Sequence, residues 1–350
     1  MPQAAKYTQV MTVIEQRIRQ GDYLLNTIPG ERRIAEETGV SHMTARKAVQ
    51  ALLDRKVLIR RPNGMLDVHP RHNTSAGSTQ IVLLYPAYSS TYLTQLRQIV
   101  SQVAEQHGLG IRPVQYVHWD DPVVHGAVFN PSGAVIIPSS LDLAEHTLAA
   151  LRENNVVALD GDLSDQGVPS IRLFPDAHIT KVFEHLRKLG HSRIDCISTH
   201  CHHPEIHRRV RLWREWIDKH NLKGELWDNP APSFDDPTPF AYKMVNQHLK
   251  HGSLKAKAFV GTTFTAAVGA MRACWEHGLV VGKDVSVSAV NVEPPARFMT
   301  PSVTGLDTPD LSTVLKRCFD WFANDDPWKG AKRLEPRKAT FLTGESTGPA

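Results

Sequence analysis

The sequence predicts an α/β protein in two parts, an N-terminal winged helix-turn-helix and a larger α/β domain of two lobes. Two observations lead to this prediction. Residues 29–61 contain two short helical patterns separated by a glycine, and the chain from residue 80 onward alternates short apolar strands with amphipathic helices. A chain of 350 residues is also long enough for more than one hydrophobic core.

The helix-turn-helix is predicted from residues 29–61. Residues 31–38 form a short helix, Gly39 ends it because glycine tolerates a positive φ, and Ser41 can cap a second helix over residues 42–54. Apolar residues recur at helical spacing in both segments, so both helices can face one small core. The start of the second helix keeps basic and polar side chains exposed, which suits the major groove of DNA.

The flanking segments extend this pattern to a winged arrangement. An apolar stripe predicts a preceding helix that ends at Gly21, and this stripe consists of Tyr7, Val10, Met11, Ile14 and Ile18. Residues 57–61 and 65–68 predict two strands joined by a turn. Residues 29–61 alone could equally form an ordinary amphipathic hairpin with a solvated basic face, but the flanking elements favour the winged helix-turn-helix.

Positive charge concentrates in this head. Residues 1–72 contain 12 Lys or Arg and 7 Asp or Glu, whereas the whole chain contains 40 and 36. The rest of the chain is therefore close to neutral. A local basic excess is typical of a phosphate-binding module, although ordinary surface charge can reach the same size.

The head resembles the DNA-binding domain of the GntR family of bacterial transcription regulators. The matching runs are residues 21–23 (GDY), 28–35 (IPGERRIA), 39–49 (GVSHMTARKAV) and 58–61 (LIRR). The chain departs from the family pattern at Gly30, where serine is usual, at His42, where arginine is usual, and at the wing tip, residues 62–65. These departures concern the operator sequence more than DNA binding itself.

The resemblance implies a set of DNA-contacting residues in the two helices and the wing. These are Glu31, Arg32, Ser41, His42, Thr44, Arg46, Asn63 and Gly64. Arg32 and Arg46 are the strongest candidates because a guanidinium can form paired hydrogen bonds with phosphate or guanine.

Neither the N-terminus nor the use of cysteine indicates an exported protein. The N-terminus lacks a signal-peptide pattern, and no apolar run approaches the roughly 18 residues that span a bilayer. Four cysteines are too few for a disulfide framework; they are Cys196, Cys201, Cys274 and Cys318. We therefore expect a cytoplasmic protein.

A polar segment at residues 70–79 predicts a linker between the two parts. It is rich in small residues and lacks apolar periodicity. The expected domains are residues 1–69 for the head, 70–79 for the linker and 80–350 for the effector-binding and dimerisation domain.

The larger domain alternates strands and helices. Strands are predicted at residues 81–85, 111–117, 134–137, 156–159, 170–173, 194–198, 258–260 and 285–290, and helices at 92–107, 141–154, 176–189, 209–219 and 265–277. Continuous apolar strands alternating with helices indicate parallel sheets, with any ligand at the carboxyl ends of the strands.

This region resembles the effector domain of the LacI/GalR family, which has the two-lobed fold of periplasmic sugar-binding proteins. The matching stretches are residues 183–194 (FEHLRKLGHSRI), 267–270 (AVGA), 278–287 (GLVVGKDVSV) and 345–347 (EST). The resemblance covers most of residues 80–347. A GntR-type head on a LacI-type body is similar to the arabinose-responsive repressors, and it implies an effector bound between the lobes.

By resemblance, the effector-binding residues lie at strand ends and on one helix. The candidates are Ser89, Ser90, Tyr92, Ser139, Asp160, Arg209, Trp213, Phe264 and Asn291. Phe264 and Asn291 stand where the family usually has aspartates, and Leu173-Phe174 where Asp-Asn is common. These changes remove hydrogen-bond acceptors, and each unpaired sugar hydroxyl costs about 1–3 kcal/mol. Three alternatives follow for the cleft: it binds a less polar carbohydrate, it binds another kind of effector, or it serves only dimerisation.

Metal binding and catalysis are not expected. Residues 199–207 (THCHHPEIH) offer imidazole and thiol groups, but their spacing fits no standard zinc pattern. The acidic pairs at 235–236 and 325–326 lie in proline-containing loops that favour solvated turns. No nucleophile or phosphate-loop motif is present in the sequence, and we expect no cofactor.

Together these patterns predict a DNA-binding transcription regulator that is a repressor and a homodimer. Two heads would bind a pseudo-palindromic operator, and a small molecule, of the carbohydrate kind or not, would change their DNA affinity. The alternatives from other classes are a solute-binding protein and a metal-dependent enzyme. Neither a secretion signal nor a metal motif supports them.

Overall fold

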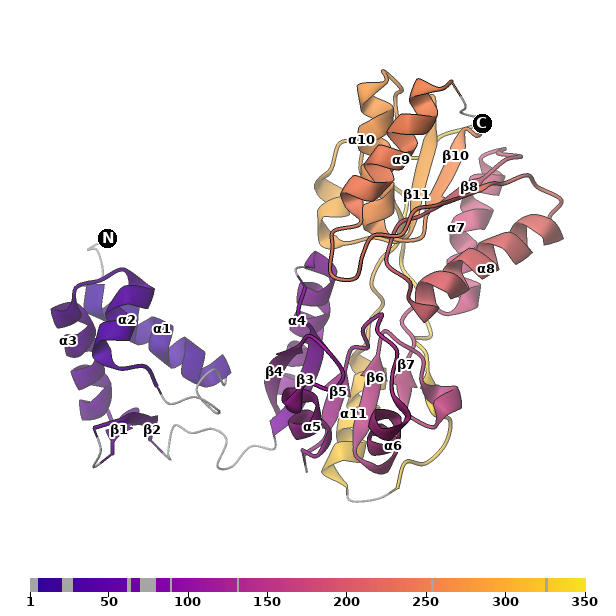
Figure 1. The fold of residues 1–350 in the computed structure, drawn as a ribbon. Coiled ribbons are helices and arrows are strands. Elements are labelled where there is room, and N and C mark those ends of the chain that lie inside the picture. The colour runs from indigo at the N-terminus through magenta and orange to yellow at the C-terminus, as the bar shows by residue number, and fades with distance from the viewer. Residues whose placement is uncertain are drawn as a thin grey trace.

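The computed structural model describes residues 6–20, 28–61, 64–69, 80–88, 90–130, 132–252, 255–324 and 327–350. The head forms one unit, and the larger domain forms two lobes, each built on a six-stranded sheet (Figure 1). The expected linker at 70–79 lies outside the described residues, so the head and the lobes are described separately. No helix in these ranges is both long and apolar enough to cross a membrane.

The head is a winged helix-turn-helix, as predicted. It consists of α1 (Lys6–Gln20), α2 (Glu31–Thr38), α3 (His42–Asp54) and an antiparallel wing of β1 (Leu58–Arg60) and β2 (Leu66–Val68). Gly39 ends α2 with φ of 64°, and the Ser41 side chain caps α3 by accepting the Thr44 N–H at 3.2 Å. Buried apolar side chains from all three helices and the wing form one core.

The first lobe is a parallel sheet with the order β4-β3-β5-β6-β7-β13. Its strands are β3 (Gln80–Pro86), β4 (Gly110–Tyr116), β5 (Ala134–Ile136), β6 (Val156–Leu159), β7 (Ser170–Ile171) and β13 (Arg333–Leu334). The helices of this part of the chain are α4 (Thr91–Gln106), α5 (Pro122–Val128) and α6 (Glu145–Glu153), together with α11 (Ser312–Ala323), which returns from the C-terminal end and packs on α4.

The second lobe has the order β9-β8-β10-β11-β12-β14 and is parallel except for β14. Its strands are β8 (Asp195–Ser198), β9 (Leu226–Asp228), β10 (Ala258–Gly261), β11 (Ser286–Asn291), β12 (Thr304–Leu306) and β14 (Phe341–Leu342). Its helices are α7 (Asp176–Lys188), α8 (Pro204–Lys219), α9 (Thr238–Lys250) and α10 (Phe264–Glu276).

Both sheets are doubly wound in the same sense. In each lobe the second strand along the chain lies at the edge beside the first, and the third lies on the other side of the first. This reversal creates a crevice at the carboxyl ends of the strands. The chain passes between the lobes after β7, after β12 and after β13, so segments far apart in sequence join them (Figure 1).

The predicted bounds differ most for two helices. Helix α8 begins at Pro204 rather than at residue 209, because the His203 ring accepts the Glu205 N–H and proline suits the first helical turn. Helix α6 begins at Glu145 rather than at 141, because Leu141 is held in a turn by Ser139 Oγ and Trp119 Nε1. Helices α5, α9 and α11 and several short edge strands were not predicted from the sequence.

Helices α9 and α10 pack closely at Gly269. A Cβ at this position would lie 2.4 Å from the Thr238 carbonyl oxygen and 2.7 Å from the Ala241 Cβ. Gly269→Ala should therefore destabilise the second lobe by about 1–3 kcal/mol, because the two helices must separate. Urea unfolding of the full chain measures this change.

Gly126 in α5 provides a matched control. It is exposed, and a Cβ there would meet no atom within 4 Å. Gly126→Ala should stabilise the chain by about 0.5–1 kcal/mol, since alanine loses less backbone entropy in a helix. Equal effects of the two substitutions would contradict close packing at Gly269.

Candidate DNA-binding surface and effector cavity

The first two turns of α3 form an exposed, basic surface. Arg46 and Lys47 line a shallow depression with Lys6, Tyr7, Met43, Thr44 and Gln50. Met43 is 69 % exposed, and the Lys47 ammonium lies 4.5 Å from the centre of the Tyr7 ring. Neither Arg32 nor Arg46 forms an ion pair with another described residue, so both guanidinium groups are available to an external anion.

Glu31 and Ser41 have partners inside the head. Glu31 accepts a hydrogen bond from Arg60 Nη2 at 2.9 Å and lies 3.8 Å from His42 Nε2, so it connects α2 to the wing and to α3. The Ser41 hydroxyl caps α3. Gly64 lies in the wing turn with φ of 83°, whereas Asn63 is outside the described residues. Through these contacts Glu31 holds basic side chains of the wing and of α3, and Ser41 fixes the start of α3.

A cavity of about 390 Å³ lies between the two lobes at the carboxyl ends of their strands. The first lobe contributes Tyr88, Ser90, Thr91, Tyr92, Leu93, Ile137, Pro138 and Asp160. The second contributes mainly polar side chains from α8, the loop before α9, the start of α10 and the end of β11. Its position agrees with the expected ligand site of doubly wound sheets.

Arg209 lies at the centre of the second-lobe wall and is only 5 % exposed. Its Nη1 donates to the Thr262 carbonyl at 2.6 Å and to Asn291 Oδ1 at 2.7 Å. Its Nε has no hydrogen-bond partner among the described residues. Its guanidinium carbon lies 5.5 Å from the centre of the buried Phe174 ring, which gives the departure at Leu173-Phe174 a packing role.

Asp160 stands opposite this arginine at the end of β6. It adopts a left-handed backbone conformation with φ of 60°, which turns the chain sharply after the strand. Burial raises the pKa of Asp160 to about 7, and the nearby Arg209 charge limits the rise. The hydroxyl of Tyr92 is buried close to this carboxyl, and burial raises the pKa of Tyr92 well above its usual value.

Six of the nine expected effector residues line the cavity. Ser90, Tyr92, Arg209, Phe264 and Asn291 line it together with Asp160. Trp213 and Ser139 do not, and Ser89 lies outside the described residues. Trp213 is 1 % exposed and donates to the Ile194 carbonyl at 3.1 Å, because it is one helical turn further from the cleft than Arg209. Ser139 Oγ accepts from the Leu141 N–H instead.

Most of the acidic lining was not predicted from the sequence. Glu205 accepts hydrogen bonds from Arg208 at 2.6 and 3.0 Å, and Glu293 accepts the Thr91 hydroxyl from the other lobe. Asp235 and Asp236 are exposed, as a solvated turn predicts, but both also line the cavity. Glu293 lies just after β11, and Glu205 lies just after the loop that follows β8. These positions near the ends of strands are the signal that could have identified both residues.

Side chains from the two lobes also touch across the cavity mouth. The Tyr88 and Phe234 rings lie 6.0 Å apart in an edge contact, and the Ser140 and Ser233 hydroxyl oxygens are 3.1 Å apart. Phe234 has φ of 74°, a conformation that is unusual for a bulky residue. With the Thr91–Glu293 hydrogen bond, these contacts hold the lobes in the arrangement seen here.

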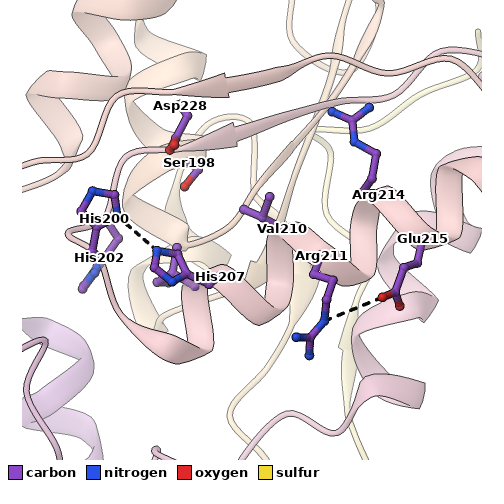
Figure 2. Close-up of a pocket in the computed structure, with 10 residues that line it drawn as sticks. Ser198, His200, His202, His207, Val210, Arg211, Arg214, Glu215 and Asp228 are labelled. Carbon is purple, nitrogen blue, oxygen red and sulfur yellow. Dashed lines mark hydrogen bonds and ion pairs between the residues drawn. The ribbon is translucent and has the colours of Figure 1, made fainter. Parts of the chain in front are cut away.

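A second pocket of about 350 Å³ lies beside α8, outside the main cavity (Figure 2). Figure 2 shows His202 and His207 facing one another, with 3.1 Å between Nδ1 and Nε2, and Arg211 directed toward Glu215. Within the described ranges, no three His, Cys, Asp or Glu side chains form a group suited to a metal ion. All four cysteines have free thiols.

Comparisons with known proteins match the two parts separately. Residues 6–66 match bacterial regulatory proteins of the gntR family, and residues 183–312 match the periplasmic binding protein-like domain. The lactose operon repressor of Escherichia coli (strain K12) is 26 % identical over 284 residues, which cover 77 % of this chain and 78 % of that protein.

Solved structures show the same fold. A dimeric lac repressor with an 11-residue C-terminal deletion has a TM-score of 0.65 at 20 % identity, covering 77 % of this chain and 100 % of the other. The lac repressor dimer bound to operator and the anti-inducer ONPF has a TM-score of 0.64 at 21 % identity, covering 81 % and 99 %. All of these relatives are repressors by name.

Fold, surface and comparisons together define the class of protein. The chain joins a GntR-type DNA-binding domain to a periplasmic-binding-protein-like domain of two lobes. It is a DNA-binding transcription regulator in which a winged head precedes a two-lobed domain with the fold of the lac repressor.

The raised pKa of Asp160 predicts how stability depends on pH. An unfolded aspartate titrates near pH ~3.9, whereas Asp160 in the folded chain holds its proton until about pH 7. The folded state therefore binds more protons in this window, and Asp160 makes stability fall as pH rises through it. Asp160→Asn cannot lose a proton, so it should melt above the parent at pH 8 and close to it at pH 4.5.

Asp162 is the opposite control in this measurement. Burial alone would raise the pKa of Asp162, but hydrogen bonds from Ser164 and the charges of Arg172 and Arg333 lower it. Asp162→Asn should therefore melt below the parent at pH 8, with the difference shrinking as the pH falls. An Asp160→Asn variant that melts below the parent at pH 8 would contradict the assigned environment of Asp160.

Proposed function

We propose that this regulator is a homodimeric repressor whose operator affinity is controlled by a small-molecule effector of the carbohydrate kind bound between the lobes. The observation that carries the proposal is the pairing of an unneutralised basic surface on α3 with a polar cavity at the strand ends. Operator binding would place its action in the cytoplasm.

DNA contact is assigned to the start of α3 and to the wing. Arg46 and Lys47 project from the exposed face of α3, where a recognition helix meets base edges, and Arg32 lies at the start of α2. Glu31 holds Arg60 of the wing and His42 of α3 in one network. Two such heads, related by a two-fold axis, would bind a pseudo-palindrome.

Dimerisation is supported by the second lobe. Among the described residues, three of the most exposed large apolar side chains lie there: Trp275 at 66 %, Val280 at 55 % and Phe298 at 86 %. Burial of such side chains favours a protein contact. The lac repressor structure bound to operator is a dimer.

Control by an effector follows from the contacts between the lobes. A ligand in the cavity would touch Tyr92 and Asp160 of one lobe and Arg209 of the other, so it would favour one lobe arrangement. The change in operator affinity can be no larger than the ligand's differential affinity for the two arrangements.

Arg46→Ala tests the assigned recognition helix. Operator sequences can be selected from a random DNA duplex library with the full chain, and affinities measured by fluorescence anisotropy at fixed salt. Loss of one base-contacting arginine should weaken specific binding by about 1–3 kcal/mol, or roughly 5- to 150-fold, and relax the preference at one base position.

Arg33→Ala removes the same charge from the same head. Arg33 is exposed, and its Nε already donates to Glu37 at 3.1 Å on a helix other than α3. It should reduce affinity far less and leave the base preference unchanged, while both variants keep the parent melting temperature. If Arg46→Ala bound its operator as tightly as Arg33→Ala, α3 would not be the recognition helix.

A further inference from the structure

Carboxyl groups outnumber basic groups in the lining of the cavity. Its lining contains five carboxyl groups, those of Asp160, Glu205, Asp235, Asp236 and Glu293, and one guanidinium, that of Arg209. The two histidines of the lining do not restore the balance. Burial lowers the pKa of His200, and it lowers the pKa of His203 to about 4, so both are neutral at pH 7.

Pairing within the protein accounts for only part of this acidic lining. Glu205 is held by Arg208, and Asp160 faces Arg209. Glu293 is different. It is 7 % exposed, and within the described chain its carboxylate accepts a hydrogen bond from the neutral Thr91 hydroxyl alone and forms no ion pair with a cation.

The surroundings of Glu293 make this isolation costly. Burial raises the pKa of Glu293, and the nearby Asp236 carboxylate raises it further. A buried carboxylate without a cation loses its hydration and gains no compensating charge. A purely structural role as a bridge to Thr91 needs only one acceptor oxygen, which a neutral glutamine would provide equally well. The hydrogen bond to Thr91 therefore does not explain why this position has a carboxyl group rather than an amide.

We propose that the effector carries a protonated amino group that binds at Glu293 beside Asp236, while its hydroxyl groups bind Asp160 and Arg209. The unpartnered Nε of Arg209 offers a donor for such a hydroxyl oxygen. Phe264 and Val268 provide an apolar wall for the face of a sugar-like ring. The ligand class is an amino sugar or another polyhydroxylated amine, and an acidic sugar would meet like charge. This inference rests on the proposed effector site.

The first measurement needs no ligand. Glu293→Gln keeps an acceptor for Thr91 and removes the buried charge, so it should raise the melting temperature of the ligand-free full chain at pH 8 by roughly 2–4 °C. Glu205→Gln removes a carboxylate that Arg208 neutralises, so it should lower the melting temperature. A Glu293→Gln variant that melts below the parent would overturn the inference.

The second measurement compares ligands that differ in charge. Glucose, glucosamine and glucuronic acid, and the corresponding galactose series, are titrated against the full chain by thermal melting and calorimetry at pH 7. The amino sugar of at least one series should bind roughly tenfold or more tightly than its neutral partner, and the acid should not bind.

Two variants decide whether Glu293 is responsible. Glu293→Gln should abolish the preference for the amino sugar, whereas Glu215→Gln should retain it, because Glu215 is exposed on α8 outside this cavity. An unchanged preference in Glu293→Gln overturns the inference. Equal or tighter binding of a neutral or acidic sugar overturns it but leaves the proposed effector site standing. No shift with any sugar overturns both.

Discussion

The cavity depends on one buried cation. Arg209 reaches from α8 to the carboxyl ends of β10 and β11, where the Thr262 carbonyl and Asn291 hold its guanidinium at 2.6 and 2.7 Å. A buried guanidinium needs such acceptors, and only the side-by-side parallel strands bring them together. The guanidinium in turn stands opposite Asp160 of the other lobe, so the charge pattern of the cleft is built across the lobe boundary.

Charge divides the chain into two recognition surfaces of opposite sign. The head presents Arg46 and Lys47 on α3 without a carboxylate partner among the described residues, as an interaction with phosphate and base edges requires. The cavity is acidic and half-enclosed, and it is closed by weak contacts between the lobes such as Ser140 with Ser233. A ligand that replaces those contacts would shift the position of one lobe relative to the other. The chain passes between the lobes three times, and these crossings couple their movements.

The sequence predicted local structure and fold better than it predicted the cavity. Helices α2 and α3 have their expected bounds, because Gly39 and Ser41 determine where they end and begin. Asp160 lies at the cavity because it directly follows β6, and Arg209 lies there because it faces the cleft from the first half of α8. Trp213 does not, since spacing along α8 cannot show how far the cleft extends. The sequence could not show that Glu293 lacks a cationic partner, because residues from both lobes surround it and only the folded structure brings them together.

The most direct test of the account is whether lobe arrangement controls operator affinity. Ser140→Cys with Ser233→Cys, in a Cys201→Ser background, allows a disulfide between lobes whose hydroxyl oxygens are now 3.1 Å apart. Operator affinity of the full chain is then measured before and after oxidation, with each single cysteine variant as a control. The account predicts a change of roughly 5- to 150-fold that a reductant reverses. Equal affinity of the locked and reduced forms would contradict it.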